Sequence, residues 1–471
     1  MCYPNSYYVG MSNLGFHSLY HRVSSFHGVR AARFFLERDG RMYSPEAQDP
    51  RKGDFLMRRG SLNGFDAIFF TVSFELDYIN LLKMLFMSSI PLLAAERDGK
   101  RPIILCGGIA PTANRHLLSP ICDILFAGDM ERGLTEILEA LFVWEFRGVD
   151  GFFSSVTGIK GVTLDLENKS ETVRAVEVHI KNPAHSVVVT DTTEFARMFL
   201  IEIIRGCRNT CTFCMTRCAA DPPRPANKES VLEHVKRALP LTKKVGLVGP
   251  VLTDHQDLPS IVREINSMGG TVSFSSFRAD HFIEEIASLV ERNGQKTVTF
   301  APETGSEELR RKIGKRLRND QLLKAVSNAL AHGVRRVRLY FMYGLPGEHE
   351  RDILSIVDLV RETVVLLHGS GLRLHLSVNP FIPKRGTALS LQRPRPVSYY
   401  RKAQEVLRQE LVGLRGVELK FEPLKQLYLH SLLSIGDRET GIQLCRFFKK
   451  GALSEFSKQA EERVLNGYTL P

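Results

Sequence analysis

The sequence predicts an α/β protein: a doubly wound sheet domain, then a partial barrel of six βα units, and a small helical extension. Short apolar runs alternate with helix-like stretches in both main regions, and the second region contains six such runs. The length of 471 residues, with 43% apolar and 24% charged residues, fits about three domains. We place the sheet domain at 1–150, a linker at 151–195, the barrel at 196–390 and the extension at 391–471.

The first region carries three apolar runs of strand length, the pattern of a Rossmann-like, doubly wound domain. The expected strands are 66–73, 102–106 and 123–127, with helices that include 76–87 and 134–146. Two of the strands end in glycine, at Gly107-Gly108 and at Gly128. Glycine there either lets the backbone approach a ligand closely or simply makes a tight turn.

The linker at 151–195 lacks helical periodicity. It carries short alternations of Val, Thr and Ile, as in 175–180 and 186–190. We therefore expect a small β linker between the two domains.

The second region indicates parallel strands in a partial TIM-type (βα)6 barrel. The strand-like runs are 198–204, 244–248, 271–275, 297–301, 336–342 and 373–378. Such barrels carry their chemistry on the loops that follow the strands, and here these loops hold cysteines, glycines, prolines and charged residues. Beyond residue 390 we expect a helix at 399–411 and a helical tail at 415–471, to which we assign no chemistry.

The composition excludes a membrane span. The longest apolar stretch, 84–95, has 12 residues and contains Pro91, whereas a membrane helix needs about 20. The N-terminus has neither a basic start nor an apolar core, so it does not resemble a secretory signal, and we expect a cytoplasmic protein.

The net charge of +11 is concentrated in one part of the chain. Residues 301–450 hold 27 Lys and Arg against 15 Asp and Glu. A basic face attracts nucleic acid, an anionic lipid surface or an anionic cofactor. The alternative is a solvated helical face.

Eight cysteines in a chain without a secretory signal favour ligands or reactive thiols over disulfides. Four of them are scattered, and we expect each to be a small buried hydrophobic residue: Cys2, Cys106, Cys122 and Cys445.

Three further cysteines, Cys207, Cys211 and Cys214, form a Cys-x3-Cys-x2-Cys loop directly after a predicted strand. Thiolates at this spacing suit a 4Fe-4S cluster with one open iron. Structural zinc is the alternative, and it would recruit Cys218 or a distant residue as its fourth ligand. We favour the cluster.

This loop, with the aromatic Phe213 before its last cysteine and six βα units around it, resembles that of radical S-adenosylmethionine (radical SAM) enzymes. In that family SAM binds the open iron, and an electron from the reduced cluster cleaves its C5′–S bond to give a 5′-deoxyadenosyl radical. The resemblance implies a 4Fe-4S cluster and SAM as cofactors, and a one-electron donor such as flavodoxin or ferredoxin. It does not identify the substrate.

The resemblance also implies roles for the other loops. It places the following residues around SAM: Gly246 and Gly249 near the methionine part, Glu303 and Ser306 near the polar groups, and Tyr343, Gly344 and Leu345 beside the adenine. Arg278 either pairs with the SAM carboxylate or forms an ion pair with Asp280 or Glu303. Glu303 has the alternative role of capping the helix that begins near Ser306.

Segments at 3–15, 246–249, 276–280, 301–306 and 340–346 together resemble a poorly characterised radical SAM subgroup with an N-terminal cobalamin-binding-like domain. The implied cobalamin contacts are Gly107, Gly108, Thr112 and Gly128. The histidine motif Asp-x-His-x-x-Gly is absent from the sequence, so no histidine of that motif would hold the cobalt. A degenerate structural domain is the alternative. The resemblance also implies a complete strand before Tyr3, where the sequence has two residues.

Three functions follow from these observations. The first is a radical SAM enzyme acting on an unknown substrate, with cobalamin-dependent methylation as one version. The second is an RNA-modifying enzyme like the methylthiotransferases, held to RNA by the basic 301–450 region, although we see no small β-barrel appended for gripping RNA. The third is a non-enzymatic binding protein stabilised by a metal.

Two further side chains have open roles. Cys218 is either a radical-quenching or methyl-carrying thiol or a bystander. His255 is either a general base or substrate contact, or it stabilises a turn together with Asp254.

Overall fold

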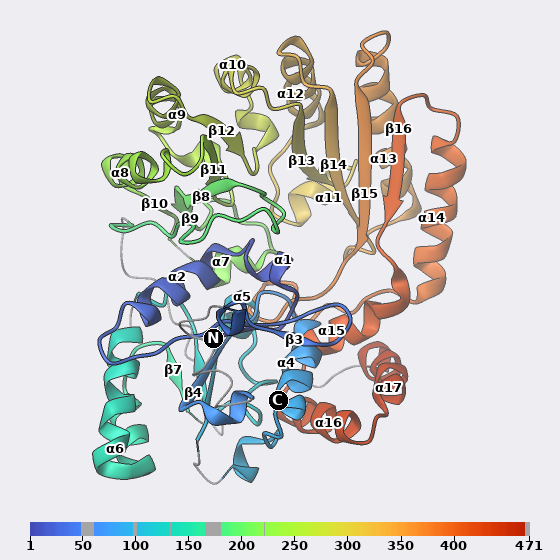
Figure 1. The fold of residues 1–471 in the computed structure, drawn as a ribbon. Coiled ribbons are helices and arrows are strands. Elements are labelled where there is room, and N and C mark those ends of the chain that lie inside the picture. The colour runs from blue at the N-terminus through green and yellow to red at the C-terminus, as the bar shows by residue number, and fades with distance from the viewer. Residues whose placement is uncertain (49–60, 98–100, 132, 165–179, 221, 467–471) are drawn as a thin grey trace.

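The computed structural model describes residues 1–48, 61–97, 101–131, 133–164, 180–220 and 222–466. Figure 1 shows the N-terminal sheet domain in the lower half of the molecule and the barrel-like core in the upper half. The last three helices return from the core and lie beside the sheet domain. The order of elements agrees with the predicted fold class.

The N-terminal domain is built on a seven-stranded sheet of order β3-β2-β1-β4-β5-β6-β7. Its inner strands pair in parallel, whereas β3 and β7 join the edges in antiparallel orientation. The strands are β1 Cys2–Tyr3, β2 Phe34–Leu36, β3 Met42–Tyr43, β4 Ala67–Thr71, β5 Ile103–Gly107, β6 Ile124–Phe126 and β7 Val162–Thr163. The three predicted strands are β4, β5 and β6. The others have two or three residues, too few to show a period.

The helices of this domain are α1 Tyr7–Gly10, α2 Leu14–Ser24, α4 Asp77–Met87, α5 Ile109–Ala113 and α6 Leu134–Val156. Helix α6 bends at Gly148, whose φ is 68°, and it continues ten residues past its predicted end. The predicted β linker is therefore wrong at its start, because residues 151–156 are helical. Residues 165–179 lie outside the described part of the chain, and 186–190 form no strand.

The core contains two parallel sheets, β12-β11-β8 and β13-β14-β15-β16. Their strands are β8 Met198–Glu202, β11 Lys244–Val248, β12 Thr271–Phe274, β13 Thr297–Glu303, β14 Arg336–Tyr343, β15 Arg373–Pro380 and β16 Val417–Phe421. The first six are the six predicted strands. The seventh, β16, corrects the expectation of a wholly helical tail. Its alternating, half-exposed residues lack the apolar run that marks the other strands.

Helices cover the outer face of the core sheets (Figure 1). They are α8 Lys228–Ala238, α9 Leu258–Ser267, α10 Glu284–Arg292, α12 Asn319–Ala331 and α13 Glu350–Leu366. Two shorter helices lie elsewhere: α7 Met215–Ala219 packs against α5 of the sheet domain, and α11 Glu307–Lys312 follows the carboxyl end of β13. Helix α9 illustrates why the outer helices form: it buries Leu258, Ile261, Val262 and Ile265, an apolar stripe at helical spacing. A short antiparallel ribbon of β9 Ile204–Arg205 and β10 Arg224–Pro225 follows β8.

The two core sheets meet at β12 and β13 without strand pairing among the described residues. The side chain of Gln295 bridges this seam. Its Oε1 accepts from the backbone N–H of Phe274 on β12 at 2.9 Å, and its Nε2 donates to the carbonyl of Thr297 on β13 at 2.9 Å. The amide of Gln295 therefore takes the place of a peptide group between the sheets.

The C-terminal helices are α14 Val397–Leu411, α15 Leu427–Ile435, α16 Arg438–Lys449 and α17 Leu453–Asn466. Helix α14 is the one predicted at 399–411. A buried polar cluster joins α15 to the sheet domain: the carboxylate of Glu75 accepts from Lys384 Nζ at 2.7 Å and from Ser434 Oγ at 3.0 Å, and lies 3.0 Å from Nε2 of His430. Burial raises the pKa of Glu75, but the hydrogen bond from His430 and the charge of Lys384 outweigh it and lower the pKa to about 2.

The described helices include none that is long and apolar enough to cross a membrane. The scattered cysteines Cys2, Cys106, Cys122 and Cys445 are all buried, as predicted.

Gln295→Leu is expected to loosen the seam. It leaves a backbone donor of β12 and a backbone acceptor of β13 without partners, which costs about 2–4 kcal/mol. Urea unfolding should show this loss, whereas the exposed Gln409→Leu should change stability by less than about 0.5 kcal/mol. Equal effects of the two variants would contradict a bridging role.

Glu75→Ala is expected to destabilise the contact between the C-terminal helices and the sheet domain by about 3–5 kcal/mol, because it leaves Lys384 buried without its counter-charge. The control is Glu96→Ala, which removes the exposed Glu96–Lys449 pair joining the same two parts of the chain. That loss should be below about 1 kcal/mol. Thermal unfolding and limited proteolysis of α15 to α17 measure both, and a control as damaging as Glu75→Ala would refute the argument.

Candidate functional site

The three clustered cysteines lie on the loop between β9 and α7. All three side chains are half-buried and line one cavity of about 750 Å³. The loop begins at Gly206, whose φ of 85° is in the left-handed region and whose missing Cβ leaves room for the carbonyl of Ala220. The predicted ligands therefore share one pocket at the end of the first core strand.

Neighbouring backbone holds this loop in place. Thr212 donates to the carbonyl of Ile313 through both its N–H and its Oγ1, at 3.0 and 3.2 Å. The N–H of Asn209 lies 3.4 Å from Sγ of Cys207. The loop is thus tied to the segment that follows α11, three core strands beyond β8.

The donors fit an iron-sulfur cluster by their chemistry, because three thiols on one loop are soft ligands around a common space. Burial raises the pKa of the Cys211 thiol to about 11, against the opposing charge of Lys315. Binding of a metal group would deprotonate the thiols. In the part of the chain that the structure describes, no three Cys, His, Asp or Glu side chains are already gathered tightly enough to hold a metal ion.

Two charged pairs flank the cysteines in the same cavity. Arg278 donates from Nε to Oδ1 of Asp280 at 2.9 Å and makes a second contact to Oδ2. This geometry is the ion pair foreseen as the alternative to a SAM contact. Lys315 Nζ donates to Oε1 of Glu303 at 2.6 Å.

Glu303 has an unusual backbone. Its φ is 68°, a conformation that costs a non-glycine residue free energy. Its side chain lines the cavity. The alternative role of helix cap belongs instead to Ser306, whose Oγ accepts from the N–H of Leu309 at 3.2 Å.

Not every predicted SAM contact lies on the cavity wall. Gly246 is buried within β11, where a Cβ would meet Leu200 and Met198, and Gly249 lies at the turn that follows. The carbonyl of Gly249 accepts from Ser276 Oγ at 3.0 Å. The described lining includes neither glycine nor Ser306, but it includes the neighbouring Pro250 and Val251.

The predicted adenine contacts are also set back from the cavity. Tyr343 and Leu345 are fully buried. Tyr343 accepts a hydrogen bond from Gln404 at 2.6 Å, and a Cβ at Gly344 would collide with Tyr400. Leu345 packs in a small apolar cluster against which Phe213 lies, and Phe213 does line the cavity. Among the described contacts of residues 343–345, Phe213 is therefore the side chain that both packs against Leu345 and lines the cavity.

His255 is buried and does not face the cavity. Its Nδ1 accepts from the N–H of Asp257 at 3.1 Å, so its Nε2 carries the proton and donates to the carbonyl of Ala226 at 2.9 Å. The turn-stabilising role is the one observed, and it excludes the role of general base in this conformation. The side chain of Cys218 lies outside the described structure.

Several lining residues were not predicted. Ser275, Gln295, Lys315, Arg338 and Tyr340 all reach the cavity. Four of them belong to the core strands or to their flanks, and a weak signal existed: polar residues at every second position of otherwise apolar strands.

A second cavity, of about 300 Å³, lies at the carboxyl edge of the N-terminal sheet. Its lining is mostly apolar and includes the predicted Gly107, Gly108, Thr112 and Gly128. A Cβ at Gly108 would collide with Val72, so this glycine is needed for chain packing. Thr112 Oγ1 donates to the carbonyl of Gly108 at 2.7 Å and lies 3.4 Å from the N–H of Gly128, which braces the two loops.

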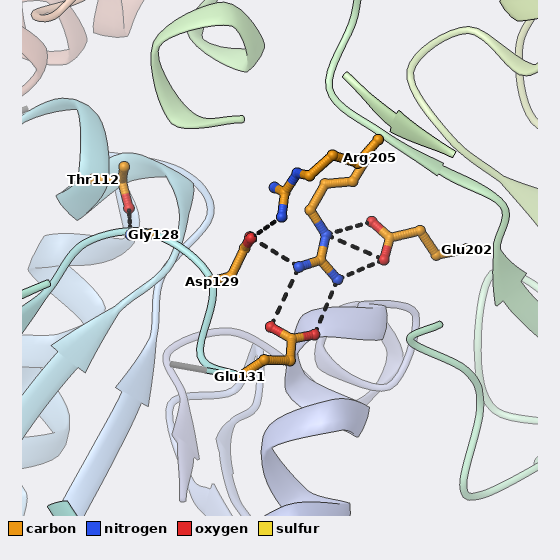
Figure 2. Close-up of polar contacts among 7 residues, drawn as sticks. Thr112, Gly128, Asp129, Glu131, Glu202 and Arg205 are labelled. Carbon is orange, nitrogen blue, oxygen red and sulfur yellow. Dashed lines mark hydrogen bonds and ion pairs between the residues drawn. The ribbon is translucent and has the colours of Figure 1, made fainter. Parts of the chain in front are cut away.

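One wall of this second cavity is an ionic cluster that joins the two domains (Figure 2). Arg205 contacts Asp129 at 2.8 Å, Glu131 at 3.2 Å and Glu202 at 2.6 Å, while Arg224 also pairs with Asp129. Burial raises the pKa of Asp129, but the hydrogen bond from Arg224 and the charge of Arg205 outweigh it and lower the pKa. Because Arg205 stands two residues before Cys207, the cluster connects the second cavity to the cysteine loop.

Comparison with known proteins covers both domains. Residues 15–162 match the family model for the N-terminal region of radical SAM proteins, and residues 201–360 match the model for the radical SAM superfamily. An uncharacterized protein of Methanocaldococcus jannaschii is 26% identical over 473 residues, which span 99% of this chain and 94% of that protein. The tRNA-2-methylthio-N(6)-dimethylallyladenosine synthase of Anaplasma phagocytophilum is 26% identical over 203 residues, 40% of this chain and 44% of that enzyme.

Among solved structures, the cobalamin-dependent S-adenosylmethionine radical enzyme OxsB with aqua-cobalamin bound has a TM-score of 0.53 at 13% identity. The similarity covers 93% of this chain and 59% of OxsB, so it is a likeness of fold to part of a longer protein. The two family models, together with the three-cysteine loop after the first core strand, identify the chain as a member of the radical SAM superfamily, enzymes that use a 4Fe-4S cluster and S-adenosylmethionine.

Proposed function

We propose that this chain carries out reductive cleavage of SAM in the 750 Å³ cavity beside Cys207, Cys211 and Cys214. The observation that carries the proposal is that loops from several core strands join the cysteine loop around one space of a size typical for small ligands. When bound, the cluster would supply the electron that breaks the C5′–S bond of SAM.

The chain's own residues would bind and orient SAM. Glu303 and Asp280 place carboxylates in the cavity, each already beside one cation. The amino group and ribose hydroxyls of SAM are donors that suit these oxygens, while Lys315 and Arg278 suit its carboxylate. Phe213 offers an apolar face next to the last cysteine.

The chain would act in the cytoplasm and take electrons from a small carrier such as a flavodoxin or ferredoxin. The partial exposure of the three cysteines supports an external electron donor, because such a donor must come near the cluster.

Cys211→Ala is expected to abolish both cluster loading and SAM cleavage, since it removes one of three thiolate ligands. Iron and sulfide content, the electron paramagnetic resonance signal of the reduced protein, and 5′-deoxyadenosine formation with SAM and a strong reductant measure the loss. The matched control Cys445→Ala, which removes a buried thiol far from the loop in sequence, should load like the native chain. Full iron content in Cys211→Ala would overturn the proposal.

We further propose that the second cavity binds part of a corrinoid. It lies between the carboxyl edge of the N-terminal sheet and the core, and its wall is largely apolar. When bound, a corrinoid would supply a transferable methyl group. The described lining contains no histidine, so the proposal assigns no imidazole to the cobalt. At about 300 Å³ the cavity would hold one edge of the macrocycle.

Gly107→Leu is expected to block corrinoid binding. A Cβ at Gly107 meets its neighbours at ordinary distances, so the longer side chain would extend into the cavity without displacing backbone. The native chain and the Gly107→Ala control should retain hydroxocobalamin on gel filtration, whereas Gly107→Leu should lose at least about tenfold in affinity. Iron content should be equal in all three. Failure of the native chain to bind corrinoid would favour a purely structural domain.

The methylthiotransferase alternative is supported by a similarity to part of the chain. The similarity to the tRNA-modifying synthase covers 40% of this chain. The described residues after 390 form helices and a strand that joins the core sheet, with no separate small β-barrel.

A further inference from the structure

The inner face of the second core sheet is polar and basic. Strand register places Arg336 beside Arg373, Arg338 beside His375, and Ser377 beside Lys420. Alternate residues of a strand share a face, so these side chains form successive rungs across β14, β15 and β16. One acidic residue, Glu418, lies among them.

Burial identifies the direction of this face. The intervening residues of β13 and β14 are buried in the core that the outer helices cover: Val298, Phe300, Val337, Leu339 and Phe341. The alternate set, Thr297, Thr299, Arg338 and Tyr340, lines the cavity that contains the cysteines. The basic rungs therefore lie on the face of the sheet that is turned towards the candidate active site, and Arg338 lines its cavity directly. We call this basic face the floor.

The floor holds positive charge that the protein leaves unpaired. His375 Nδ1 lies 3.0 Å from Glu418 Oε2. Within the described residues, none forms an ion pair with Arg336, Arg338, Arg373 or Lys420. Nε of Arg336 and Nε2 of His375 are buried and lack any hydrogen-bond partner. Buried polar atoms are normally satisfied, so these two nitrogens have hydrogen-bonding capacity that water or an anion can use.

A small cavity of about 200 Å³ lies at the amino-terminal ends of β13, β14 and β15. Lys296, Arg335, Arg336 and Arg373 line it, together with Thr297, which also lines the large cavity. Basic groups thus extend from the amino-terminal edge of the open barrel towards the cysteines. Glu303 pairs in register with Phe341, three residues after Arg338 on β14. At about 3.3 Å per residue, Arg338 is therefore roughly 10 Å from Glu303 along the strand direction.

We propose that the substrate of this enzyme is a small molecule with a phosphate or carboxylate group, bound on the barrel floor by Arg336, Arg338 and Arg373. This assignment rests on the proposed function. Guanidinium groups bind both oxyanions in bidentate fashion. Anchoring at this depth would hold a carbon roughly 10 Å away from the anionic group near the cysteines, where SAM would be cleaved.

The test uses the full chain with its cluster reconstituted. Calorimetry measures binding of three probes: inorganic pyrophosphate, citrate and a short single-stranded oligoribonucleotide. Pyrophosphate binding alone assigns a phosphate group, and citrate binding alone assigns a carboxylate. Arg338→Gln and Arg336→Gln should each weaken the bound probe about tenfold or more. The control Arg292→Gln removes the same charge from the exposed end of an outer helix and should bind like the native chain.

Three results would overturn the inference: no probe binds, Arg338→Gln binds as tightly as Arg292→Gln, or only the oligoribonucleotide binds. The last would indicate RNA as the substrate. Iron content of every variant is measured in parallel, so loss of binding with a fully loaded cluster isolates the floor. Failure of 5′-deoxyadenosine formation in the native chain would refute the proposed function, whereas anion binding lost specifically in the floor variants would still support the basic site.

Discussion

The amide of Gln295 forms hydrogen bonds across the seam between the two halves of the core, which also share one hydrophobic cluster. Parallel strands pair within each sheet, and every loop that reaches the cysteines depends on the sheets keeping one relative position. At the seam, Gln295 supplies one acceptor to β12 and one donor to β13, so its side chain continues the hydrogen bonding where the backbone stops. The same side chain lines the large cavity. The seam and the candidate active site therefore share a wall.

Two ionic clusters contribute to the attachment of the sheet domain to the rest of the chain. In the first cluster, Arg205 and Arg224 pair with carboxylates beside the second cavity. In the second cluster, Glu75 of the sheet domain contacts Lys384, His430 and Ser434. A buried ion pair specifies geometry more than it adds stability, because each charge loses its hydration. We interpret both clusters as devices that fix the orientation of the N-terminal domain against the cysteine loop.

The sequence predicts what local patterns encode. Six core strands are predictable because each is an apolar run, and the three candidate ligand cysteines because their spacing is short. By contrast, β16 was missed because only a partner sheet makes a half-exposed Val-Glu-Leu-Lys-Phe segment a strand. Glu75 and His430 are 355 residues apart, and no local pattern joins them. Arg278 and Asp280 are close in sequence, so their pairing could be foreseen as an alternative, whereas the burial of Tyr343 and Leu345 depends on α14 and the segment around Phe381.

The distribution of paired and unpaired charge distinguishes two parts of the large cavity. Near the cysteines, Arg278 and Lys315 already have carboxylate partners, so a ligand there would exchange or add to existing contacts. On the floor, Arg336 and Arg338 have no such partner in the described structure, and part of the Arg336 guanidinium is buried without one. Arg338 is exposed, whereas burying Nε of Arg336 without a partner costs free energy that a bound anion would recover. The floor therefore offers unpaired cations to an anionic group, whereas the region near the cysteines offers both charges, as a ligand such as SAM requires.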